Sequence, residues 1–234
     1  MTGTIINIAT ILLGSAIGIF FGSRLPDRLK NTVTAGLGLF TLVIGIAMFL
    51  ESEEALIVLG GLLIGAVLGE WWKIEEGLES LGVLLEARFG GVSNAEESDR
   101  FVRGFLTASL LFCIGPMTIL GSIQDGLSGN YELLAVKSVL DGFASLAFAS
   151  TLGVGVAFSV IVVLVFQGGI SLLAAQLSSF ITEPMMIEMT AVGGVILVGL
   201  ALSSLLEIKK IRVGSFLPAL AVSPFIVWVL SLFP

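Results

Sequence analysis

The sequence predicts an all-α fold, a polytopic bundle of transmembrane helices, from three observations. Of the 234 residues, 56% are hydrophobic and only 12% are charged, and the mean hydropathy is +1.09. A soluble domain of this length usually has about a quarter of its residues charged. The apolar residues form blocks of about 20, the length that crosses about 30 Å of hydrocarbon as a helix. The blocks are continuous rather than alternating, which argues against a transmembrane β-barrel.

Eight apolar segments follow one another along the chain, and we expect each of them to cross the membrane. The fifth segment is the least typical, because it contains both Lys137 and Asp141. Another topology stays open, with six crossings, in which the fourth and fifth segments pair as a re-entrant hairpin. The eight segments are 4–22, 32–50, 55–72, 101–122, 132–151, 154–177, 186–206 and 213–232.

Basic residues indicate the cytoplasmic side of these segments. Every Lys and Arg except Lys137 lies in or beside the connections that follow the first, third and seventh segments. Because cytoplasmic loops are enriched in Lys and Arg, we expect these connections inside and both termini outside. If the fifth segment alone failed to cross, the basic stretch EIKKIR would move outside. The charge pattern therefore favours eight spans.

Residues 74–100 form the longest connection, within a chain that we expect to be a single integral membrane domain over residues 1–234. The first part of this connection repeats apolar residues on one helix face and places glutamates elsewhere. That pattern is typical of an amphipathic helix on the cytoplasmic membrane interface. The simpler alternative is a linker helix without a partner. The apolar stripe consists of Ile74, Leu78, Leu81, Leu85 and Phe89.

Glycines recur every fourth residue in the first and third segments. Such spacing places them on one helix face and lets a neighbouring backbone approach closely, which is how many membrane helices pack. We interpret them as helix-packing residues, in a compact bundle or at the seam of a homodimer. They are Gly14, Gly18 and Gly22 in the first segment, and Gly61, Gly65 and Gly69 in the third.

The first three segments resemble the last three, which predicts weak inverted repeats. GSAIG (14–18) matches QGGIS (167–171), and VIGIA (43–47) matches LVGLA (197–201). The first segment would run inward and the sixth outward, so the two halves would be inverted. Inverted repeats are common in secondary transporters, whose binding sites lie near the membrane midplane.

Polar side chains and helix-breaking residues converge near the middle of the predicted membrane. The fourth segment contains Gly115 and Pro116, which interrupt backbone hydrogen bonding and present Thr118. The sixth segment places Gln167 at a similar depth. Irregular backbone at this depth is tolerated where it is buried in protein or lines a wet cavity.

The fifth segment has a polar face, because Lys137, Asp141 and Ser145 are spaced by four residues. A charge at the centre of a membrane helix costs about 2.5–3.5 kcal/mol on insertion scales. One interpretation is that the Lys137–Asp141 pair only neutralises itself and docks the helix. The other is that the pair lines the path of a solute or ion, as intramembrane ionisable residues usually do. Asp141 would then bind a cation or proton, and Lys137 would bind an anion or act as its counter-charge.

Several classes of function lack their usual residues in this sequence. The chain has no histidine, and its one cysteine, Cys113, lies in an apolar run. The sequence contains no cluster of metal ligands, no nucleophile beside an evident base and no glycine-rich phosphate loop. We therefore expect no metal, no cofactor, no enzymatic activity and no nucleic-acid partner.

Four stretches of sequence carry a resemblance to a known family. They are GPMTILGSIQDGL, KSVLDGFASLAFASTLGVGVAFS, the QGGI that follows, and GLALSSLLEIKKIRVGSFLPAL. Together they resemble the bacterial membrane proteins of the domain of unknown function 554 family, the YqgA/YdfK-like proteins, over essentially the whole chain. The resemblance implies a location in the bacterial cytoplasmic membrane, and it implies no particular substrate.

These observations favour a small secondary transporter or channel-like permease for an ion or small polar solute. Its partners would be the lipid bilayer and that solute or ion. The alternative is a membrane scaffold or regulatory protein that does not transport and acts through its glycine faces or the 74–89 helix. The residues that we expect to bind the solute or ion are Asp141, Lys137, Ser145, Gln167, Thr118, Gly115 and Pro116.

Overall fold

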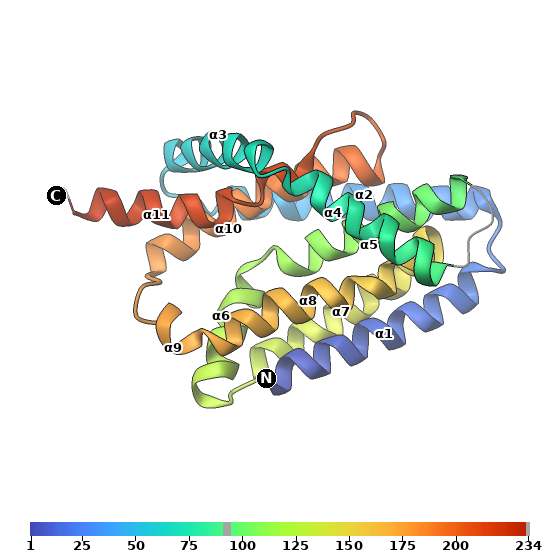
Figure 1. Ribbon diagram of the computed structural model, residues 1–234, viewed down its shortest axis with the longest axis horizontal. Helices are drawn as coiled ribbons and strands as arrows, with labels where there is room; N and C mark the ends of the chain where they lie inside the picture. The colour runs from blue at the N-terminus through green and yellow to red at the C-terminus, as the bar shows by residue number, and fades with distance from the viewer. Residues whose placement is uncertain (91–94, 233–234) are drawn as a thin grey trace. The chain divides into compact units, whose positions relative to one another are not determined.

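The computed structural model describes residues 1–90 and 95–232. Within these ranges the chain is almost entirely helical and contains no strand (Figure 1). Six of the described helices are long and apolar enough to cross a membrane, and two bent helix pairs raise that number to eight if each pair is one span. The prediction of an all-α, multi-pass membrane protein is confirmed. Residues 91–94 of the long connection lie outside the described ranges.

The helices divide into two compact units, while the expectation of a single integral domain over residues 1–234 stays a prediction. The first unit, Met1–Leu37 with Glu79–Ser179, contains α1 (Thr2–Gly22), η1 (Glu86–Gly90), α5 (Ala95–Cys113), α6 (Pro116–Ser128), α7 (Glu132–Leu152), α8 (Gly155–Leu172) and α9 (Ala174–Leu177). The second unit, Gly38–Leu78 with Phe180–Pro234, contains α3 (Ala55–Trp71), α10 (Glu183–Leu200), η2 (Ala201–Leu205), η3 (Val213–Phe216) and α11 (Ala219–Ser231). Two helices, α2 (Asp27–Phe49) and α4 (Ile74–Leu85), contribute to both units.

In the first unit, α1 packs along α7 through its glycine face. Gly14 lies against the backbone of Gly142. Two turns further along α1, Gly22 lies against the backbone of Ser150. The residue numbers rise together, so the two helices run parallel. Without side chains at these glycines the backbones approach closely, as is typical of small residues in membrane helices.

The fifth apolar segment forms α7 as one continuous helix of 21 residues. At 1.5 Å per residue its length is about 31 Å, which matches the hydrocarbon core of a bilayer. This length favours a full crossing over a re-entrant turn.

The fourth apolar segment is broken near its centre, where the axes of α5 and α6 are bent by 64°. Gly115 makes the bend with a φ of 154°, a backbone conformation that residues with side chains rarely adopt. Pro116 then begins α6, where its missing N–H costs no helical hydrogen bond. The break falls where the sequence predicts it.

In the second unit, α3 packs against η3 and α11 through its own glycine face. Gly61 lies against Ser223. Two turns later in α3, Gly69 lies against Ser215, so α3 and α11 run antiparallel.

Helices α2 and α10 are also antiparallel neighbours in this unit. Gly45 of α2 lies against the backbone of Gly194 in α10. Earlier in α2, Gly38 lies against the later residue Leu206. Small residues therefore bring both helix pairs of the second unit into close contact.

Glu188, on α10, holds the beginning of α3. Its Oε1 accepts hydrogen bonds of 3.0 Å from the backbone N–H groups of Glu53 and Glu54, and its Oε2 accepts one of 2.8 Å from the Ser52 hydroxyl. The first N–H groups of a helix lack partners within the helix and favour a negative charge. Glu188 is only 3% exposed, and its carboxylate supplies both a hydrogen-bond acceptor and a negative charge.

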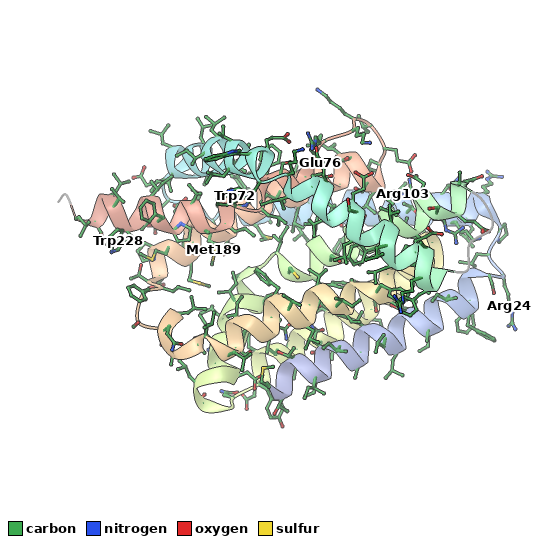
Figure 2. The ribbon with its side chains drawn as sticks, in the orientation of Figure 1. Arg24, Trp72, Glu76, Arg103, Met189 and Trp228 are labelled. Carbon is green, nitrogen blue, oxygen red and sulfur yellow. The ribbon has the colours of Figure 1, made fainter. Side chains whose placement is uncertain are left out.

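Exposed tryptophans lie near helix ends of the second unit. Trp72 directly follows α3, and Trp228 lies in the last turn of α11 (Figure 2). Tryptophan is enriched where a membrane helix meets the headgroup layer, so these positions agree with spans that end there.

The amphipathic helix predicted at 74–89 is present as α4 and the π-helical turn η1, but protein covers part of its apolar stripe. Leu85 lies in a buried cluster with Phe101, Val102 and Phe105 of α5. Phe89, at the end of the stripe, remains 59% exposed. The periodicity alone could not distinguish contact with α5 from contact with the membrane interface.

We expect Gly65→Ala to lower the free energy of unfolding by about 1–3 kcal/mol, because its methyl group would overlap backbone atoms of Ala219 on α11. Gly60→Ala on the same helix is the matched control, since its methyl group would meet only the tip of Ile226 at ordinary contact distance. Unfolding in mixed micelles with increasing dodecyl sulfate measures both. Equal stability of the two variants would contradict the close α3–α11 contact.

Candidate functional site

A buried polar network joins α1, α7 and α8 within the first unit. The Asn7 side-chain Nδ2 donates to Asp141 Oδ2 and to Gln167 Oε1, each over 3.0 Å. Gln167 Nε2 in turn donates to Thr4 Oγ1 over 3.2 Å. The ammonium group of Lys137 forms an ion pair with Asp141 Oδ2. Three helices far apart in sequence thus contribute to one connected set of polar groups.

This network is secluded from solvent. Thr4, Asn7 and Gln167 are 0% exposed, while Lys137 and Asp141 are 6% and 8% exposed. A buried charge is expensive unless it is paired and hydrogen-bonded, and Asp141 has both kinds of partner. Adjacent turns of α7 provide the pairing, because residues four apart face the same side of a helix.

One fully buried atom of the network, the side-chain oxygen Oδ1 of Asn7, has no hydrogen-bond partner in the part of the chain that the structure describes. Both hydrogens of the Asn7 amide are directed to Asp141 and Gln167, so the amide orientation leaves its oxygen as the free acceptor. Buried polar atoms are nearly always hydrogen-bonded. Asp125 Oδ1 and several buried hydroxyls are exceptions as well, so what distinguishes Asn7 Oδ1 is its place beside the Lys137–Asp141 pair. The site therefore offers an oxygen acceptor beside a carboxylate.

The broken fourth span borders the same site. The Lys137 Nζ lies 6.0 Å from the centre of the Phe112 ring, at the end of α5. The C-terminal end of a helix carries partial negative charge, which favours a cation nearby. Across the break, the Thr118 hydroxyl donates to the backbone oxygen of Phe112 over 3.2 Å, so Thr118 joins α5 to α6. Gly115 and Pro116 shape this boundary through the backbone.

The structure separates Ser145 from the network. Its hydroxyl donates to the backbone oxygen of Gly142 on its own helix over 2.9 Å, and it faces Gly14 across the α1–α7 contact. Of the residues that the sequence suggests for binding, Lys137, Asp141 and Gln167 form one connected network. Thr118, Gly115 and Pro116 lie at the neighbouring break, and Ser145 lies in the helix contact.

Sequence reasoning missed Asn7 and Thr4, although the sequence contains a signal for Asn7. Asn7 precedes Gly14 by seven residues, two helical turns, and therefore lies on the glycine face of α1. Which polar group of the neighbouring helix such a residue reaches depends on the register of the two helices. That register requires the structure.

Another buried carboxylate, Asp125 of α6, lies at the beginning of α1. Its Oδ2 accepts a hydrogen bond of 3.0 Å from the backbone N–H of Gly3. Asp125 therefore serves the first turn of α1, where N–H groups lack helical partners. Among the described residues, no group of three or more Cys, Asp or Glu side chains is arranged to hold a metal ion.

The comparisons with known proteins cover nearly the whole chain. A family model described as "Protein of unknown function (DUF554)" matches residues 2–228. The chain belongs to this family. The residues of the polar network, from Thr4 to Gln167, all lie within the matched range.

The chain matches two bacterial relatives over nearly their whole length. It is 32% identical over 237 residues to the uncharacterized membrane protein YdfK of Bacillus subtilis (strain 168), covering 100% of this chain and 98% of the relative. It is 30% identical over 218 residues to the uncharacterized protein YqgA of Escherichia coli (strain K12), covering 93% of this chain and 92% of the relative. No solved structure matches the chain.

We expect Lys137→Gln to lower the free energy of unfolding by about 3–5 kcal/mol, because it leaves the buried Asp141 carboxylate without its counter-charge. The double variant Lys137→Gln/Asp141→Asn should regain most of that loss, since it removes both charges and keeps side chains that hydrogen-bond. Unfolding in mixed micelles compares the two. A double variant as unstable as the single one would contradict a direct Lys137–Asp141 pair.

Proposed function

We propose that the protein is a small secondary transporter or channel-like permease for an ion or small polar solute. The observation that carries the proposal is the unpartnered Asn7 oxygen beside the Lys137–Asp141 pair, buried among three helices. We place the protein in the bacterial cytoplasmic membrane with both termini outside, as the basic connections favour.

The donors and acceptors of the network limit the chemistry of the solute. Asn7 Oδ1 and the Asp141 carboxylate are acceptors, while the amide hydrogens of Asn7 are already used. A cation, or a solute that presents hydrogen-bond donors, complements such a pair of oxygens. The proposal therefore favours a cation, a proton or a donor-rich solute over an anion at this position.

Lys137 and an incoming cation could exchange places at Asp141. Its ammonium occupies Asp141 in this structure, so an incoming cation would compete with a tethered counter-charge. When the cation leaves, Lys137 returns to Asp141, and the buried carboxylate is never left unpaired. This exchange stabilises the empty site, because an unpaired charge buried in a membrane protein costs free energy.

The broken helix beside the pair supports a transport role. Secondary transporters commonly build midplane sites from discontinuous helices, whose ends direct partial charges at the solute. The α5–α6 break at Gly115 lies next to Phe112, which neighbours Lys137. Inverted repeats are common in the same transporters. The antiparallel pairs α2–α10 and α3–α11 are compatible with the inverted repeat that the sequence predicts.

A non-transporting scaffold has weaker support, because both glycine faces are occupied within the chain. The face of α1 packs on α7, and the face of α3 packs on α11. A partner protein or a second copy would have to use other surfaces. No enzymatic step is part of the proposal.

Flux into proteoliposomes tests the proposal with the double variant Lys137→Gln/Asp141→Asn. We expect the wild type to transport at least one member of a panel of monovalent cations and small amines, and the double variant to lose that flux while it remains folded. Ser145→Ala is the matched control on α7, because the Ser145 hydroxyl donates to the Gly142 carbonyl of its own helix.

Thermal unfolding with the same panel gives an independent measurement. A solute that binds only the folded protein at about 100 times its dissociation constant should add roughly 2.7 kcal/mol of stability. We expect this shift in wild type and Ser145→Ala and not in the double variant. If no solute stabilises wild type and none is transported, the pair is structural and the transporter proposal is wrong.

A further inference from the structure

The second unit contains an apolar cavity of about 270 Å³ that is separate from the polar network. Described residues of α3, α10, η2 and η3 surround it, and no charged or hydrogen-bonding side chain lines it. Several of these residues are half-buried, so the cavity opens at the surface of the unit. Lining residues include Leu62, Val195, Gly199, Leu202, Ile211 and Phe216.

The stretch that brings Ile211 to the cavity is held by specific hydrogen bonds. Helix α10 ends in the π-helical turn η2, and the chain then folds back so that Ile211 returns to the cavity. The Ser203 hydroxyl fixes this return, since it accepts from the Ile211 N–H over 3.1 Å and donates to the Ile211 oxygen over 3.2 Å.

Two lysines stand directly before the returning residue. Lys209 and Lys210 are exposed and immediately precede Ile211, and neither forms an ion pair with any residue of the described ranges. Their neighbour Arg212 differs, because it pairs with Glu70 and Glu76 over 2.7 and 2.8 Å. Ile208, on the other side of the lysines, is 70% exposed. The connection thus presents two exposed lysines, in a stretch that also contains Glu207, next to an apolar cavity.

We propose that this cavity binds one acyl chain of an anionic phospholipid, whose phosphate lies against Lys209 and Lys210. The site combines an apolar cavity with a cationic rim, and an anionic lipid combines the complementary parts. Basic pockets at the cytoplasmic ends of membrane helices recognise anionic headgroups in this way. The proposal does not depend on the transport function of the first unit.

The dimensions suit a segment of one acyl chain. The cavity is slightly smaller than the roughly 300–1,000 Å³ of typical small-molecule sites. On α10 its lining runs from Val195 into η2 at Leu202, a rise of about 10 Å along the helix axis. A polar solute would find no hydrogen-bonding side chain there, whereas a hydrocarbon chain needs none.

Two variants separate the two halves of the site. Gly199→Leu should fill the cavity, because a Cβ at Gly199 would have only ordinary contact with Val213 and the longer side chain would extend into the open space. Lys209→Gln/Lys210→Gln removes the cationic rim and leaves the cavity unchanged. Arg24→Gln/Arg28→Gln is the control for net charge, since it removes two basic residues from another predicted cytoplasmic connection.

The experiment measures lipid bound to the detergent-purified protein by native mass spectrometry, with phosphatidylglycerol and phosphatidylethanolamine of matched chains added in equal amounts. We expect wild type and the arginine control to bind phosphatidylglycerol about tenfold better than phosphatidylethanolamine, a preference that two interfacial lysines can supply. The lysine variant should lose the preference, and Gly199→Leu should lose the bound lipid itself.

Three outcomes would overturn the proposal. They are equal binding of the two lipids by wild type, an unchanged preference in the lysine variant, and undiminished binding by a folded Gly199→Leu. Glycerol 1-phosphate, the headgroup without chains, is the remaining arm. If it displaces phosphatidylglycerol at similar concentration, the site binds a soluble phosphate and not a lipid. The lysine variant tests the proposal even if Gly199→Leu does not fold.

Discussion

Close contact between α1 and α7 determines both the packing of the first unit and the composition of its polar network. Gly14 and Gly22 let the backbone of α7 approach without intervening side chains. That approach places Asn7, two turns before Gly14, within hydrogen-bond reach of Asp141. A larger residue at Gly14 would separate the helices and leave buried polar groups unpaired, which costs more in a membrane than in water. Packing and site chemistry therefore depend on the same helix face.

The same contact restricts the topology. Since α1 and α7 run parallel, an odd number of crossings separates them if both span. If α2, also long and apolar enough to span, is one of these crossings, the bent pairs α3–α4 and α5–α6 both cross or both do not. Helix α3 follows α11 from Gly61 to Gly69, and α11 belongs to a segment long and apolar enough to span. We infer that α3 crosses beside α11, and that α5–α6 therefore crosses too. Contacts and the distribution of basic residues independently favour eight spans.

The sequence could predict those features that depend on local composition and spacing. Span-length apolar blocks, the break at Gly115 and the Lys137–Asp141 spacing are all local, and the structure contains each of them. The role of Asn7 depends on the register of α1 against α7, which links residues 134 positions apart. Glu188 is a similar case, because its partners lie in a distant connection. Local patterns do not encode such pairings.

The hydrogen bonding of the network is incomplete, and this bears on the choice between a docking pair and a solute site. A pair that only anchored α7 would be most stable with every neighbouring polar atom satisfied, because an unpaired buried acceptor costs about 1–3 kcal/mol. Here the Asp141 carboxylate has its partners, whereas the adjacent Asn7 oxygen does not. Replacing Asn7 by an apolar residue would remove that cost, but it would also leave the buried Gln167 Oε1 without its Asn7 donor. Asn7 therefore joins Asp141 and Gln167 as a donor, and its free oxygen is the feature on which the proposed solute site rests.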